Sequence, residues 1–92
     1  MLRVHQVFKT IKCMLIIDPK TKRKRFVPLP NQGLPTNMFI EADKAIRELH
    51  SEGTIFIASE ITVLQKTIGR LYLRAKHQSL TPLKDLKLDI HK

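Results

Sequence analysis

Tryptophan is absent from this 92-residue sequence, and cysteine and tyrosine occur once each. A single cysteine excludes an internal disulfide, and without a second cysteine or closely spaced histidines the ligand pattern of a zinc site is missing. The three glycines are scattered, which excludes a glycine-rich loop that cradles phosphates. Because no catalytic, metal or nucleotide-binding signature is present, we expect a protein without enzymatic activity, metal or cofactor.

Long apolar segments are missing as well. No window approaches the roughly 18 apolar residues of a membrane span, and residues 1–6 lack the apolar stretch of a signal peptide. Cys13 lies in an apolar run, residues 11–17, and is interpreted as a small buried residue that fits a reducing compartment. We therefore expect no membrane span and an intracellular, cytoplasmic location, or a nuclear one if the organism has a nucleus.

Acidic residues are scarce, since 8 Asp and Glu stand against 17 Lys and Arg, for a net charge of +9. The cations concentrate in residues 1–35 and 61–92, whereas residues 36–60 carry an acidic excess. In residues 20–25 five of the six side chains are cationic. Holding so much like charge together costs electrostatic repulsion, which a polyanion relieves. The charge distribution predicts a nucleic acid as partner, or less strongly an anionic membrane surface.

The length and the apolar fraction of 42 % indicate one folded domain that spans residues 1–92. Residues 11–17 predict a buried strand that stops at Asp18 and Pro19, a pair typical of turns. Residues 23–29 predict a second strand. The cationic run between these strands is therefore expected at the tip of a hairpin.

A helix is predicted over residues 38–52. Four apolar side chains share one face at helical spacing: Phe39, Ala42, Ile46 and Leu49. Asn37 can cap the start of this helix, and Ile40 points away from the apolar stripe. The stripe predicts a helix that packs one face on a sheet.

Residues 54–76 admit two interpretations. Strand formers favour two strands, residues 54–64 and 70–76, and the first of them carries four apolar residues of the same parity: Ile55, Ile57, Ile61 and Val63. The same segment also follows helical spacing, which would make residues 60–76 a second helix. Frequent β-branched residues and Gly69 in mid-segment favour the strands, and alternation over residues 86–90 predicts a last short strand.

These elements predict an α+β fold of order ββαββ, with a possible extra strand at the C-terminal end. A small, mainly antiparallel sheet would pack on one amphipathic helix. The alternative is a winged-helix-like fold, in which the second helix, residues 60–76, pairs with the first and the basic hairpin forms the wing.

Nine residues are candidates for contact with nucleic acid. Lysine and arginine neutralise backbone phosphates, and a tyrosine on a cationic strand face can stack on a base. The candidates are Lys20, Lys22, Arg23, Lys24, Arg25, Arg70, Tyr72, Arg74 and Lys76. The plainer interpretation is that residues 20–25 form a solvated turn and residues 70–76 an ordinary exposed strand face. If the two segments share one continuous surface, the binding interpretation is favoured instead.

The sequence predicts a small, non-enzymatic protein that binds DNA or RNA, and it does not distinguish the two nucleic acids or set an oligomeric state. One alternative is an interaction or assembly subunit that docks on an acidic protein or pairs through a sheet edge. An enzyme built from residues scattered along the chain is a further alternative.

Overall fold

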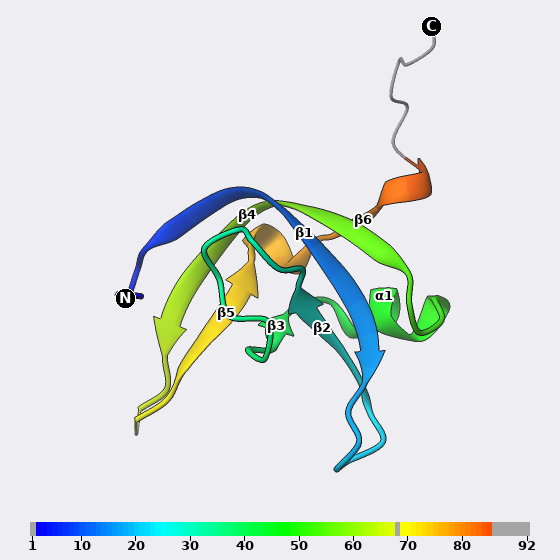
Figure 1. Cartoon of the computed structure of the whole chain (residues 1–92), viewed down its shortest axis with the longest axis horizontal. Helices are drawn as coiled ribbons and strands as arrows, with labels where there is room; N and C mark the ends of the chain where they lie inside the picture. Colours follow the sequence, from blue (N-terminus) through cyan, green and yellow to red (C-terminus); the bar gives the residue numbers. More distant parts are fainter. Residues whose placement is uncertain (1, 68, 86–92) are drawn as a thin grey trace, which may run out of the picture.

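In the computed structural model, which describes residues 2–67 and 69–85, five strands close into a small barrel (Figure 1). The strands are β1 (Val7–Ile17), β2 (Lys24–Pro28), β3 (Ile40–Glu41), β4 (Ile55–Gln65) and β5 (Leu71–Ala75). Their order around the barrel is β1-β2-β3-β5-β4, and pairing of β1 with β4 closes it. All of these pairs are antiparallel except β3–β5, which is parallel.

Shorter elements complete the described chain. A single helix, α1 (Lys44–Leu49), lies between β3 and β4, and β6 (Thr81–Pro82) pairs with β4 between the 3-10 turns η1 (Lys76–Gln78) and η2 (Leu83–Asp85). This strand order, with its parallel pair and its helix after β3, is the connectivity of the OB fold, a five-stranded Greek-key barrel. In residues 2–67 and 69–85 no helix is long and apolar enough to cross a membrane.

The two longest strands, β1 and β4, bend, so that the two halves of each strand pair with different neighbours. Thr10 and Ser59 fall between the paired residues Lys9–Glu60 and Ile11–Ala58, and Thr10 adopts a φ of 53°, a conformation that β-branched residues rarely take. The parity of buried residues in β4 changes at this point, with Phe56 and Ala58 buried before it and Ile61 and Val63 buried after it. The predicted common face of Ile55, Ile57, Ile61 and Val63 is therefore wrong, because the bend turns the strand over.

The barrel interior is filled by tightly packed apolar side chains. The rings of Phe26 and Phe56 meet edge to face with centroids 5.1 Å apart, and Leu15, Leu73 and Cys13 beside them are fully buried. Burial raises the pKa of the Cys13 thiol to about 12, so the thiol stays protonated at neutral pH. The interpretation of Cys13 as a core residue is confirmed.

The predicted helix over residues 38–52 is wrong. Only the six residues of α1 are helical, none of them is buried, and Leu49 is 78 % exposed. Asp43 rather than Asn37 caps the helix, since its Oδ1 accepts a hydrogen bond of 3.0 Å from the backbone N–H of Ala45. Ile40, off the stripe of the predicted helix, is 3 % exposed because it pairs with Phe26 inside the barrel.

The fold class changes with this element. The protein is mostly sheet, and neither the α+β fold with a helix packed on a sheet nor the winged-helix-like alternative describes it. Residues 60–65 lie in β4 and residues 71–75 lie in β5, so the strand interpretation is confirmed over these parts of the segment and the helix is wrong. The hairpin with a cationic tip is also present, between β1 and β2. The strand predicted over residues 86–90 lies outside the described residues.

We expect Phe56→Ala to lower the free energy of unfolding by about 3–5 kcal/mol, because it removes a fully buried ring and leaves a cavity. Leu49→Ala is the matched control, since this side chain is 78 % exposed and its loss should change stability by less than about 0.5 kcal/mol. Urea denaturation of both variants measures the difference. Equal effects of the two substitutions would contradict the barrel core described here.

Candidate functional site

The loop between β1 and β2, residues 18–23, is an ordered turn organised by Asp18. Its Oδ1 accepts a hydrogen bond of 3.1 Å from the backbone N–H of Lys20, and its Oδ2 accepts one of 3.0 Å from the Thr21 hydroxyl. Its backbone N–H donates to the carbonyl of Arg23 (2.8 Å), and its carbonyl accepts from the N–H of Lys22 (2.7 Å). Lys22 takes the left-handed φ of 64° that such a tight loop requires. The cationic run therefore has a defined shape.

The carboxylate of Asp18 is stabilised in its ionised form. The backbone N–H of Lys20 lowers the pKa of Asp18 most, partial burial opposes this shift, and the Thr21 hydroxyl and the charges of Arg25 and Lys20 add to the lowering. The loop that presents the cations thus depends on one anion at its base.

The five cations of this run have different environments. Lys20, Lys22 and Arg23 are exposed. Lys24 turns toward the helix, where its amino group donates a hydrogen bond of 2.6 Å to the carbonyl of His50. The guanidinium of Arg25 lies 5.3 Å from the centroid of the Phe39 ring. Three of the predicted contact residues are therefore exposed, whereas Lys24 and Arg25 also hold parts of the fold together.

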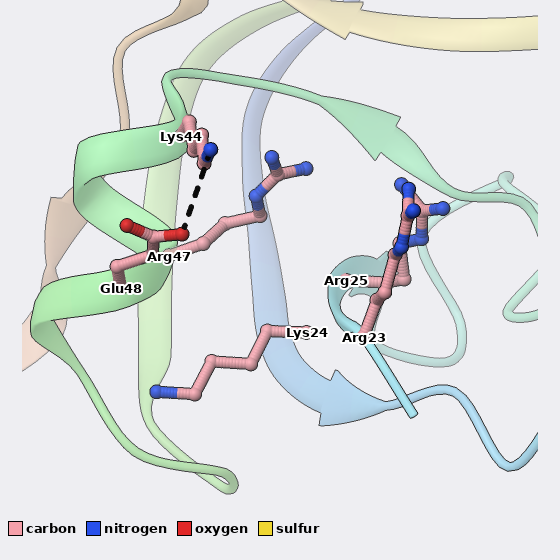
Figure 2. A pocket seen from close by; sticks show the side chains of 6 residues that line it. All are labelled: Arg23, Lys24, Arg25, Lys44, Arg47 and Glu48. Carbon is pink, nitrogen blue, oxygen red and sulfur yellow. Dashed lines mark ion pairs between the residues drawn. The ribbon is translucent and has the colours of Figure 1, made fainter. Parts of the chain in front are cut away.

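A groove of about 740 Å³ lies between β2 and α1 (Figure 2). We call it the basic groove, and its lining residues are Arg23, Lys24, Arg25, Lys44, Arg47 and Glu48. Figure 2 shows Arg47 extending from α1 toward β2, while Glu48 turns to Lys44, with 3.9 Å between their charged atoms. Five cations face one carboxylate, so the groove attracts anions.

Arg25 has an unusual environment at the edge of this groove. Its Nε is buried, and it has no hydrogen-bond partner among the described residues. A buried, unpaired donor of a charged group is costly. The contact with Phe39 offsets part of this cost.

A second surface lies on the outside of β2, β3 and β5. Ile40 is buried and pairs with both Phe26 and Leu73, so the side chains next to these three point away from the core, and among them only Val27, next to Phe26, is buried. We call this surface the outer face, and its residues are Arg25, Phe39, Glu41, Tyr72 and Arg74. The parallel register pairs Ile40 with Leu73 and Glu41 with Arg74, and extending it by one residue before Ile40 places Phe39 opposite Tyr72.

Cations surround the tyrosine of the outer face. Lys66 Nζ lies 4.8 Å and Arg74 Cζ 6.0 Å from the centroid of the Tyr72 ring. Arg74 also donates a hydrogen bond of 2.6 Å from Nε to Oε1 of Glu41. This hydrogen bond, together with the charge of Glu41, raises the pKa of Arg74, so the guanidinium stays charged.

The outer face joins the two predicted groups of site residues. Arg25 ends the first group and contacts Phe39, while Tyr72 and Arg74 of the second group lie on the strand paired with β3. Figure 1 shows the β1–β2 and β4–β5 loops projecting to the same side of the barrel, one on each flank of β3. Arg70 is exposed in the second of these loops, and Lys76 is exposed beyond the other end of β5. Arg25 of the first group and Tyr72 and Arg74 of the second therefore lie on either side of β3, whereas the tips of the two loops stand apart and Lys76 lies beyond the other end of β5.

Three residues of this region escape sequence reasoning. Phe39, which is 40 % exposed, was expected on the buried stripe of a helix, yet it points outward next to β3. Lys44 and Arg47 were not among the predicted contact residues, and they face β2 across the basic groove. The sequence carries no alternation that signals β3, because residues 39–41 are two apolar residues followed by an acidic one.

The titratable side chains suggest no metal site. In the part of the chain that the structure describes, no three His, Cys, Asp or Glu side chains lie close enough to hold a metal ion.

Replacing Asp18 with asparagine should destabilise the fold at neutral pH and reduce its sensitivity to acid. Because the folded state lowers the pKa of Asp18, the ionised carboxylate stabilises the fold above its unfolded pKa of about 3.9, and this contribution is lost as the pH falls through the folded pKa. Urea midpoints should therefore differ between wild type and variant at neutral pH, and the difference should shrink as the pH falls below about 3.9 toward the lowered folded pKa. Glu60, whose pKa is lowered by the hydrogen bond from Lys9, titrates in both proteins and cancels. A difference that stays constant with pH would contradict this role.

Comparison with known proteins gives no relative. No family model, no curated protein and no solved structure matches the chain. The likeness to the OB fold accordingly rests on strand order alone, and any function has to be argued from the side chains themselves.

Proposed function

We propose that this chain is a non-enzymatic nucleic-acid-binding protein that takes up single strands. The observation that carries the proposal is the outer face, where two partly exposed aromatic side chains, Phe39 next to β3 and Tyr72 on the paired strand β5, lie close to the cations Arg25, Lys66 and Arg74. Bases stack on such rings, and neighbouring guanidinium and ammonium groups neutralise the phosphates.

The surrounding charge extends this surface. The basic groove adds Lys44 and Arg47 next to Arg23, and the β1–β2 loop adds Lys20 and Lys22. Phosphates bound along these cations release condensed counterions, which is the main source of sequence-independent affinity. The bases of a duplex are already stacked on each other, so rings exposed on a protein surface favour single strands.

The strand order gives independent but weaker support. Barrels with this connectivity bind oligonucleotides or oligosaccharides on the face of their second and third strands, and with the loops that join strands one to two and four to five. In this chain those parts are the outer face and the two basic loops. Because a shared fold does not by itself transfer function, the aromatic and cationic side chains carry the argument.

We expect a labelled single-stranded oligonucleotide to bind with an affinity that falls steeply with salt concentration. Phe39→Ala and Tyr72→Ala should each weaken binding by about 1–3 kcal/mol, because each removes a stacking ring. Arg47→Ala should reduce the slope of log K against log salt by about 0.7, the loss of one phosphate contact on a single strand. Fluorescence anisotropy at several salt concentrations measures both effects.

Lys84→Ala is the matched control for charge. Lys84 lies on η2, which Figure 1 shows on the opposite side of the barrel from the two hairpin loops, and its loss should leave the affinity almost unchanged. Absence of binding at low salt would refute the proposed function. Tighter binding of a duplex than of a single strand would refute the stacking interaction.

A second candidate function is docking on an acidic protein. One observation favours it, since Leu49 is 78 % exposed at the end of α1, beside the basic groove. Pairing through a sheet edge has less support, because the five strands close on themselves.

A polyglutamate peptide separates the two functions. If the protein binds nucleic acid through stacking as well as charge, an oligonucleotide of equal charge should bind more tightly than the peptide at the same salt concentration. Tighter binding of the peptide, lost in Leu49→Ser, would favour docking on an acidic partner.

A further inference from the structure

An acidic residue lies in the middle of the cationic outer face. Glu41 is on β3, between the strand that carries Arg25 and the strand that carries Arg74. Its side chain is 45 % exposed and that of Arg74 is 44 % exposed, so both groups are accessible from outside. A carboxylate repels phosphates, and its presence here does not fit a surface that binds the backbone alone.

The Glu41–Arg74 pair keeps most of its hydrogen-bonding capacity. The contact of 2.6 Å uses one N–H of the guanidinium, Nε, and one carboxylate oxygen, Oε1. Four N–H groups remain on the terminal nitrogens of Arg74, and the second oxygen of Glu41 remains an acceptor. The pair therefore presents an acceptor and several donors side by side, in a fixed arrangement.

This pair lies beside the stacking rings. Arg74 Cζ is 6.0 Å from the centroid of the Tyr72 ring, and Glu41 is two residues from Phe39 on the same face. Stacked rings are offset from each other, so a base displaced toward Arg74 on the Tyr72 ring brings its edge to the guanidinium and to the carboxylate of Glu41 hydrogen-bonded to it. Single-stranded bases are commonly recognised by hydrogen bonds to such exposed edges.

We propose that Glu41 and Arg74 read the edge of a base stacked on the outer face and select bases with an exocyclic amino group, cytosine over thymine or uracil. This inference rests on the proposed binding of single strands. The N4 amino group of cytosine donates to Glu41, and the neighbouring N3 and O2 accept from Arg74. In the same position, thymine and uracil place the O4 carbonyl against the carboxylate of Glu41 and the N3–H donor against the donors of Arg74, so two of the three contacts become repulsive.

The same carboxylate orients the strand. Repulsion between Glu41 and phosphate keeps the sugar–phosphate chain away from the middle of the outer face. The phosphates then follow the basic groove and the two loops, and the bases turn inward toward Phe39 and Tyr72.

Equal-length oligodeoxycytidine and oligothymidine test the selection, measured by anisotropy at mildly alkaline pH and fixed salt. We expect wild type to bind the cytidine strand about fivefold more tightly or better. Glu41→Gln should bind both strands more tightly, because it removes a negative charge and releases Arg74, and the ratio should fall toward one. Arg74→Lys keeps the charge but loses the planar fork, so it should also lower the ratio.

Glu48→Gln is the matched control. It removes a carboxylate from the basic groove, where Glu48 pairs with Lys44, and should strengthen binding of both strands without changing their ratio. Equal affinities of wild type for the two strands, or an unchanged ratio in Glu41→Gln, would overturn the selection by Glu41 while leaving the proposed function intact. Absence of binding to both strands would overturn the proposed function itself.

Discussion

The barrel and its outer face depend on the packing of the buried Ile40 side chain against its neighbours. β3 has two residues, and this side chain anchors it between Phe26 of β2 and Leu73 of β5. Without that anchor the sheet would stay open between β2 and β5, and the core would be exposed there. The outer face would also lose Phe39 and Glu41, which lie between Arg25 and Arg74. The same contact turns Phe39 and Glu41 outward, because neighbours of a buried strand residue point the opposite way.

Local patterns in the sequence predict the local parts of this fold. The hairpin at residues 11–29, the alternation of β5 and the burial of Cys13 follow from short runs of strand formers next to turn residues. The prediction of a helix over residues 38–52 is wrong because Ile40 pairs with distant strands and is buried between them. The apolar side chains at helical spacing are not enough to form the longer helix against these pairings. For the site, the basic residues are predictable from composition, whereas Phe39 and the basic groove arise only when β3 and α1 take their places.

Most of the acidic residues have a structural task. Asp18 shapes the β1–β2 loop, Asp43 caps α1, and Glu41, Glu48 and Glu60 pair with Arg74, Lys44 and Lys9. A net charge of +9 therefore does not describe a uniformly basic surface. It describes a chain in which a few carboxylates hold particular cations in position, while several other described cations lie in the β1–β2 loop and in the groove beside α1.

The pairing of β1 with β4 has a consequence for how the chain reaches its fold. The ion pair between Lys9 and Glu60 joins residues 51 positions apart, and β1 cannot be covered on that side until β4 exists. Contacts of such sequence separation make barrels fold slowly, because a long loop must close before it is stabilised. Before β4 is synthesised, the apolar residues 11–17 of β1 can pair only with β2 and remain exposed on the other side. The cationic loop between them then acts by repulsion between chains, keeping unfinished copies of the barrel apart.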